Sequence, residues 1–171
     1  AAEGDARFDA IGRLIAEWVA AGEPASDVWE VDIRRFAPFT GNRRALAERT
    51  GQPAGELVKA FGTHLSDTFA RGYPAFFARA GNLFDFLESI EGHIHVEVRK
   101  LYPDAELPSF KVEQRTPTRL VMVYRSPRRM GALSEGLIVG SARKFGVEVA
   151  VRTEPIEGSD GEATRFVIDL V

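Results

Sequence analysis

The sequence contains no cysteine. This absence excludes a disulfide framework, a thiolate zinc site and a cysteine nucleophile. The chain also lacks Gly-x-Ser-x-Gly and Gly-x-x-x-x-Gly-Lys, so neither an esterase nucleophile elbow nor a phosphate-binding P-loop is supported. Because these catalytic motifs are missing, we expect a binding protein rather than an enzyme.

Long apolar runs and a strong excess of one charge are also missing. No run of 18 apolar residues and no charged-then-apolar signal segment occurs, so we expect a cytoplasmic protein without a membrane partner. The 22 basic and 25 acidic residues give a net charge of −3, which argues against nucleic acid as a whole-surface partner. The length of 171 residues suits one domain with a real core or two very small ones.

Histidine is scarce, and two of the three histidines fall in one helical pattern. Apolar residues recur every three or four positions over residues 83–101, which contain His93 and His95. The two side chains should project to roughly opposite sides of a helix, so one apolar pocket can contain only one of them. A neutral imidazole beside this stripe suits an axial ligand of haem iron, and a surface or core histidine is the alternative. Glu88 and Glu91 are typical of a solvated helix face.

Periodicity predicts an α+β fold. Helical spacing covers residues 7–21, 56–71, 83–101 and 131–145, and residues 27–33 alternate like a short strand. Alternation with a period of two predicts strands at residues 112–114, 119–124, 147–153 and 165–171. We therefore expect a helical N-terminal lobe packed on a C-terminal four-stranded antiparallel sheet with ββαββ order.

A row of polar side chains ends the second predicted strand. If the chain stays extended there, Tyr124, Ser126 and Arg128 alternate onto one face. A phenol, a hydroxyl and a guanidinium on one line suit a ligand with two carboxylates. The alternative is a strand that leaves the core with solvated polar residues.

Together these motifs resemble a known family. His95, Tyr102-Pro103, Pro108-Ser109-Phe110 and Tyr124-x-Ser126-x-Arg128, in this order, resemble the H-NOX domain of bacterial gas sensors and soluble guanylate cyclase. The resemblance covers about residues 46–171 and implies haem b (iron protoporphyrin IX) held between the lobe and the sheet. It implies that His95 is the iron ligand, that Tyr124, Ser126 and Arg128 hold the propionates, and that Pro108 presses on the haem plane. The apolar haem wall would include Phe69, Tyr73, Val98 and Leu137, with His64 and His93 at the surface.

The resemblance also implies a function. Such a domain is a sensor of nitric oxide, and of carbon monoxide, that signals by conformational change. Its partner would be a signalling protein such as a histidine kinase or a cyclic-dinucleotide enzyme. Family members that hold oxygen carry a distal tyrosine where this sequence has Leu133. We therefore expect nitric oxide and carbon monoxide to bind and no stable oxygen complex to form.

The first 45 residues depart from this pattern. Residues 8–45 are instead similar to a segment of flavin-dependent dimethylglycine and sarcosine dehydrogenases, without the Gly-x-Gly-x-x-Gly that seats a flavin pyrophosphate. We expect an atypical segment at residues 1–45 and an H-NOX-like domain at 46–171. Two alternatives stay open: a haem-free interaction or structural domain with a replaced distal lobe, and a detached piece of a flavin-dependent demethylase.

Overall fold

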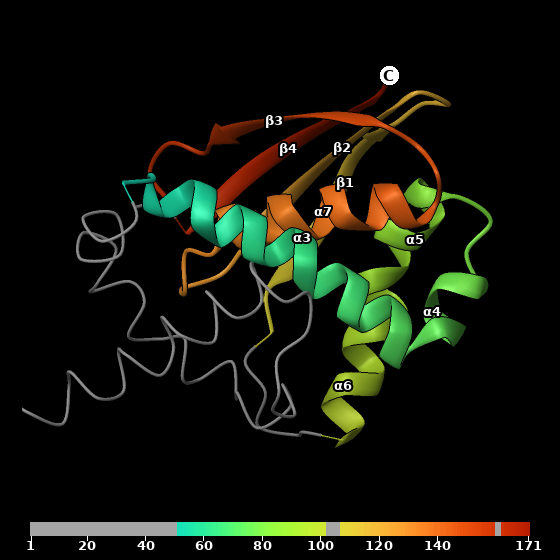
Figure 1. Cartoon of the computed structure of the whole chain (residues 1–171). Coiled ribbons are helices and arrows are strands. Elements are labelled where there is room, and N and C mark those ends of the chain that lie inside the picture. The colour runs from blue at the N-terminus through green and yellow to red at the C-terminus, as the bar shows by residue number, and fades with distance from the viewer. Residues whose placement is uncertain (1–50, 102–106, 160–161) are drawn as a thin grey trace, which may run out of the picture. The chain divides into compact units, whose positions relative to one another are not determined.

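The structure is a computed structural model of the chain that describes residues 51–101, 107–159 and 162–171 (Figure 1). The chain forms two compact units, residues 1–54 and 55–171, and the description below concerns the second. The predicted helix at residues 7–21 and the predicted strand at 27–33 lie outside the described residues. No helix within the described ranges is both long and apolar enough to cross a membrane.

A four-stranded antiparallel sheet forms one layer of this unit. It comprises β1 (Ser109–Arg115), β2 (Arg119–Arg125), β3 (Val149–Pro155) and β4 (Ala163–Leu170), in the spatial order β1-β2-β4-β3. Alternate residues of the central strands enter the core, where Leu120, Met122, Phe166 and Ile168 are at most 1% exposed. The predicted α+β class and ββαββ order are confirmed.

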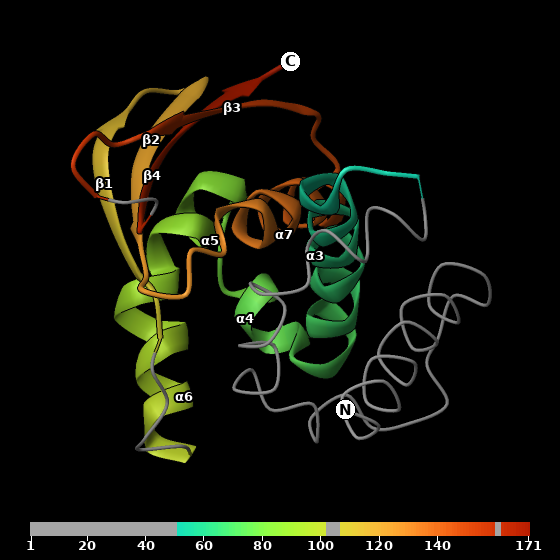
Figure 2. The same cartoon turned by 90° about the vertical axis from the view of Figure 1, so that its left-hand side faces the viewer.

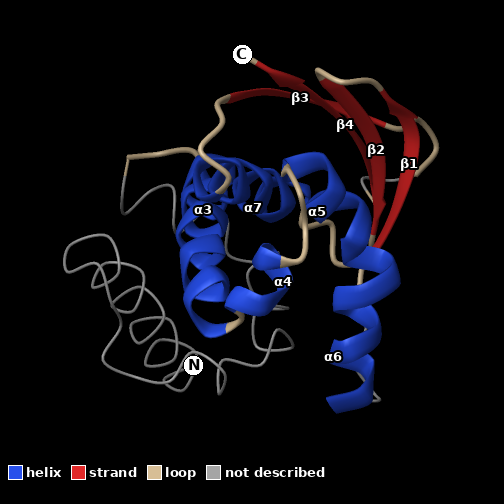
Figure 3. Ribbon diagram, turned by 90° about the vertical axis from the view of Figure 1, so that its right-hand side faces the viewer, coloured by secondary structure: helices blue, strands red, loops and turns tan. Residues whose placement is uncertain are grey.

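Helices cover the inner face of this sheet. Helix α7 (Gly131–Lys144) contacts β3 and β4, and Figure 2 shows it between the sheet and α3 (Ala54–Gly72). The short helix α4 (Pro74–Ala78) follows α3 after Tyr73. Small residues line the α3–α7 contact, where the Ser66 and Ser141 hydroxyls lie 3.1 Å apart. Figure 3 shows the same layering with helices and strands distinguished by colour.

The predicted helix at residues 83–101 is interrupted in its middle. The chain forms α5 (Leu83–Ser89), a π-helix η3 (Ile90–Ile94) and α6 (His95–Leu101). The N–H of His95 donates to the carbonyl of Ile90, five residues earlier, which is the π-helical pattern. The expectation of one uninterrupted α-helix is therefore wrong at these five residues. Gly92 lies in this segment, and its low helix propensity favours a departure from regular α-helix.

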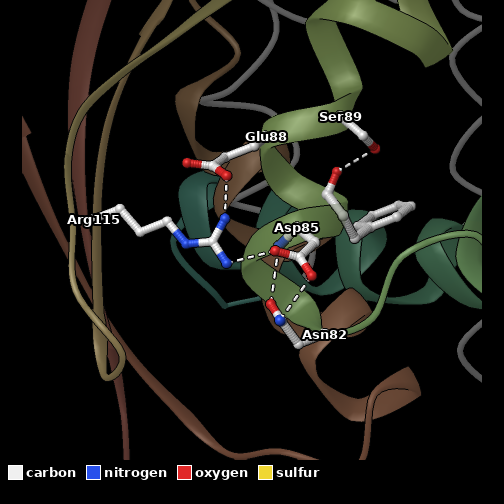
Figure 4. A network of polar contacts seen from close by, with 6 residues as sticks. Asn82, Asp85, Glu88, Ser89 and Arg115 are labelled. Carbon is white, nitrogen blue, oxygen red and sulfur yellow. Dashed lines mark hydrogen bonds and ion pairs between the residues drawn. The ribbon is translucent and has the colours of Figure 1, made fainter.

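An arginine on the sheet ties β1 to α5. The Arg115 guanidinium binds the Glu88 carboxylate and, at 2.5 Å, the Asp85 carboxylate (Figure 4). Asn82 caps α5 by accepting the Asp85 N–H at 3.0 Å, and its amide donates to the Asp85 carboxylate at 2.8 Å. The helix that leads to His95 is thus anchored at its first turn to the far end of β1.

Candidate functional site

His95 is a buried histidine at the start of α6. It is 7% exposed, whereas His93 is exposed. The His95 ring lies 5.9 Å from the Phe110 ring, which in turn lies 5.5 Å from the Tyr124 ring. Helix α6, β1 and β2 thus each contribute one ring to a continuous row. His93 is exposed, as expected, and His64 is half-buried.

Glu91 contacts both His95 and the sheet. Its Oε2 atom lies 3.2 Å from His95 Nδ1 and accepts the Phe110 backbone N–H, also at 3.2 Å. The interpretation of Glu88 and Glu91 as a merely solvated face is therefore wrong, since both bind residues of the site or the sheet. The sequence carried one signal for this contact: Glu91 lies four residues before His95, a spacing that brings side chains together on a helix.

The surroundings keep the imidazole of His95 neutral. Burial lowers the pKa of His95 below its usual value, Glu91 opposes this shift, and Arg99 adds to it. A neutral imidazole that donates from Nδ1 to Glu91 keeps Nε2 as its lone-pair nitrogen, which is the form that binds a metal. The described residues contain no group of three or more His, Cys, Asp or Glu side chains that could hold a metal ion. A single neutral imidazole is the form in which a protein holds the iron of a porphyrin, whose other ligands come from the porphyrin itself.

The predicted polar row has a different geometry from the expected one. Strand β2 ends at Arg125, and Ser126 to Arg129 form a turn in which the Arg129 N–H donates to the Ser126 carbonyl at 3.1 Å. The expectation of an extended strand end is wrong here because Pro127 takes the second position of the turn, where its fixed φ is favoured. Arg129 ends the turn with a positive φ of 53°.

The two hydroxyls of the row hold this turn in place. The Ser126 hydroxyl accepts the Arg128 N–H at 3.2 Å, and the Tyr124 hydroxyl accepts the Met130 N–H at 3.1 Å. Both residues are buried, and Arg128 is half-buried. Each hydroxyl keeps its own hydrogen for donation to a further acceptor. Tyr124 at the end of β2 thus belongs to the row of rings, and Ser126 and Arg128 lie in the short loop that follows it.

The predicted apolar wall residues come from several elements. Pro108 is half-buried and directly precedes β1. Phe69 of α3 and Leu137 of α7 are half-buried, and Tyr73 is half-buried with its ring 6.0 Å from that of Phe76. Val98 lies in α6, but its side chain, like Tyr102 and Pro103, falls outside the described residues. No described contact places the wall residues of α3 and α7 against His95.

The fold and the histidine define a class of protein. A sheet covered by helices presents one buried, neutral histidine whose Nδ1 is already engaged, next to a loop with hydroxyl and guanidinium groups. These donors fit a cofactor that combines a metal with carboxylate groups, because Nε2 suits iron and the loop suits carboxylates. This combination is typical of haem-binding domains.

Comparison with known proteins agrees with this class. Residues 43–153 match the family described as Haem-NO-binding, which is about two thirds of the chain. The unliganded Fe(II) H-NOX protein from K. algicida is 34% identical, with a TM-score of 0.73 over 80% of this chain and 73% of that one. The chain belongs to the Haem-NO-binding, or H-NOX, family. Its cofactor is haem, and its class is that of the haem-based gas sensors.

Two structures from S. oneidensis extend the comparison. The H-NOX protein in its Fe(II)NO state is 26% identical, with a TM-score of 0.68 over 75% of this chain and 71% of that one. The H-NOX domain in its Fe(II)CO state is 22% identical, covers 94% of this chain and 97% of that one, and has a TM-score of 0.71. This second likeness shows the fold alone.

The N-terminal region matches a different family. Residues 21–60 match the FAD dependent oxidoreductase central domain, which overlaps the Haem-NO-binding match over residues 43–60. A 4-methylaminobutanoate oxidase (formaldehyde-forming) from Paenarthrobacter nicotinovorans is 43% identical over 47 residues, 28% of this chain. The chain spans only 6% of the length of that oxidase. The predicted flavoenzyme-like segment at the N-terminus is therefore confirmed as a sequence similarity.

Proposed function

We propose that this chain binds ferrous haem through His95 and senses nitric oxide and carbon monoxide. The observation that carries the proposal is the buried, neutral His95 whose Nδ1 is engaged by Glu91, in a chain of the Haem-NO-binding family. His95 would hold the iron, and reduced haem iron would supply the capacity to bind diatomic gases. The S. oneidensis H-NOX structure in its Fe(II)NO state supports the choice of nitric oxide. An H-NOX structure from Shewanella woodyi in the Fe(II)CO state, 32% identical to this chain, supports that of carbon monoxide.

The remaining predicted site residues take supporting roles in this proposal. Tyr124, Ser126 and Arg128 would hold the propionates, with the guanidinium as the charged partner. Pro108 would press on the haem plane, and Phe69, Tyr73, Val98 and Leu137 would exclude water from it. The loop geometry supports the first role, because both hydroxyls and the arginine lie within five residues of one another and the hydroxyl hydrogens are not used by the loop.

We also propose the boundaries of the haem-binding domain and the way in which it passes on a signal. Residues 46–171 would form the haem-binding module, and residues 1–45 a separate segment of oxidoreductase type that lacks a flavin pyrophosphate motif. The output would be a conformational change read by a signalling protein such as a histidine kinase or a cyclic-dinucleotide enzyme. The polar contacts that join the His95 helix to β1 support such a transmission.

An absorption spectrum tests the proposal. The full chain, produced with haem available and reduced without oxygen, is expected to show a strong Soret band that shifts on adding nitric oxide or carbon monoxide. A chain with no cofactor absorption would support a haem-free interaction domain with a replaced distal lobe. A flavin absorption band would support the detached piece of a demethylase. Either of these results would overturn the proposal.

A further inference from the structure

Glu91 is the one described side chain whose polar atoms contact His95. Its Oε2 atom lies 3.2 Å from His95 Nδ1. The same oxygen accepts the N–H of Phe110, the second residue of the edge strand β1. One carboxylate oxygen of the π-helix η3 therefore contacts both the first residue of α6 and the second residue of strand β1.

The ordinary alternative is that Glu91 is a surface ion-pair residue. Its side chain is 38% exposed, and its other oxygen lies 3.6 Å from Arg99 Nη2. Such exposed pairs contribute little to stability. The distances favour the inner contacts, because both hydrogen bonds of Oε2 are shorter than the Arg99 contact. The side chain of His95 is also only 9% exposed, so its Nδ1 has little access to water as an alternative acceptor.

The π-helix explains how Glu91 reaches both partners. Residues four apart on a helix are neighbours, and the π-helix that holds Glu91 ends directly before His95. The N–H of Phe110 lies on an edge strand, where it has no further strand as a partner. The carboxylate thus satisfies a backbone donor that would otherwise need water.

We infer that Glu91 is a positioning residue for His95. It holds the imidazole in the tautomer with a proton on Nδ1 and a lone pair on Nε2, it fixes the orientation of the ring, and it increases the electron donation of Nε2. Through Phe110 it also links any movement of the His95 helix to β1. This inference rests on the proposed role of His95 as the iron ligand. The physical basis is that a carboxylate on the remote N–H of a metal-bound imidazole fixes its tautomer and raises its basicity.

Two substitutions at Glu91 and one control test the inference. Glu91→Gln keeps the shape and an acceptor oxygen but removes the charge, and Glu91→Leu removes the acceptor. Glu88→Gln is the control, because Glu88 lies in the same helical stretch, binds Arg115 and does not contact His95. The full ferrous protein is studied by resonance Raman spectroscopy of the iron–histidine stretch, and the rate of haem loss is measured.

The expected order follows from the strength of the contact. The stretch should move to lower frequency in Glu91→Gln and further in Glu91→Leu, while Glu88→Gln leaves it unchanged. Haem loss should be about ten- to a hundredfold faster in Glu91→Leu, as is typical when an outer partner of a metal ligand is removed. An unchanged stretch in both Glu91 variants would overturn the inference, even where His95→Gly shows that His95 is the ligand.

A second measurement does not depend on haem. With ¹⁵N-labelled histidine in the full chain produced without haem, nitrogen NMR above the imidazole pKa should show protonated Nδ1 in the wild type and in Glu91→Gln. It should show protonated Nε2 in Glu91→Leu. Hydrogen exchange of the Phe110 amide should also accelerate in Glu91→Leu and not in Glu88→Gln. If the tautomer is unchanged in Glu91→Leu, the inference fails. If instead His95→Gly keeps the haem spectrum, the proposed function fails while these readings still report on Glu91.

Discussion

Gly62 of α3 and Gly136 of α7 lie against each other without room for a side chain on either. A Cβ atom added to Gly136 would lie 2.9 Å from the Gly62 Cα, and one added to Gly62 would lie 3.1 Å from the Gly136 Cα. The added atoms would also meet the backbone carbonyls of Lys59 and Leu133. The obstructing atoms are backbone, so rotation of a side chain cannot relieve the overlap. The packing of α3 on α7 therefore depends on glycine at both positions.

The first prediction follows from this contact. Gly136→Ala should lower the free energy of unfolding by about 1 kcal/mol, because overpacking costs about 2 kcal/mol and the higher helix propensity of alanine offsets about 1 kcal/mol of this cost. Gly55→Ala is the control, since a Cβ there meets nothing within 4 Å and should leave stability equal or higher. Denaturant titration measures both. Equal effects of the two substitutions would show that α3 and α7 are not packed this closely.

The Arg115 contacts with Asp85 and Glu88 make a smaller contribution to stability. Arg115→Met should cost about 0.5–1 kcal/mol, because its partners are partly exposed and exposed ion pairs contribute little individually. Arg143→Met, at an exposed position near the end of α7, should stay within about 0.5 kcal/mol of wild type. The measurement is again denaturant titration. A loss of several kcal/mol for Arg115→Met would mean that this network is a buried one.

The propionate role predicts an order of haem retention. A guanidinium–carboxylate contact of about 1.5–3 kcal/mol exceeds a neutral hydroxyl bond of about 0.5–1.5 kcal/mol. Arg128→Ala should therefore speed haem loss more than Ser126→Ala does. The Ser126 hydroxyl also accepts the Arg128 N–H, so Ser126→Ala should act partly by loosening the turn. Haem transfer to an excess of apomyoglobin gives the rate of haem loss from each variant. Equal rates would contradict the proposed contact of Arg128 with a haem propionate.

We predict that the choice of gas depends on Leu133, which lies at the start of α7 where the oxygen-binding members of the family carry a tyrosine. Leucine offers no hydrogen-bond donor, so the ferrous protein should bind nitric oxide and carbon monoxide but not retain oxygen. Leu133→Tyr should raise oxygen affinity about ten- to a hundredfold, the equivalent of a donor of about 1.5–3 kcal/mol in a dry pocket. Leu133→Phe is the control without a hydroxyl. A long-lived oxygen spectrum in the wild type after exposure to air would contradict this prediction.

Much of the fold was predictable from periodicity. The strand pairs and helix α7 appear within a few residues of their expected positions, because a half-buried strand or helix has to repeat its apolar residues at a fixed spacing. The π-helix at residues 90–94 was not predicted, since one extra residue per turn barely alters an apolar pattern of three- and four-residue steps. The first strand starts at Ser109 because Phe110 pairs with Tyr124 across the sheet, which local sequence does not reveal.

The candidate site was predictable only in part. The apolar stripe drew attention to His93 and His95, and the resemblance to the H-NOX family selected His95, whose burial agrees with that interpretation. Glu91 was missed because a half-exposed carboxylate looks like any solvated acid until the position of the Phe110 N–H is known. The turn at Ser126 was missed although Pro127 signals it, because the extended interpretation fitted a row of three polar side chains. Sequence patterns indicate which side chains face inward. The contact between Glu91 and the Phe110 N–H depends instead on where a helix and a strand meet in space.

The identity of the iron ligand is the central claim, and paired histidine substitutions test it most directly. His95→Gly and His93→Gly are produced with haem, and the absorption spectrum of each reduced protein is recorded with and without added imidazole. His95→Gly should lose the Soret band, or regain it only with imidazole, because the buried His95 is the proposed ligand. His93→Gly should leave the spectrum nearly unchanged, because His93 is exposed. Loss of haem in His93→Gly together with its retention in His95→Gly would contradict the account.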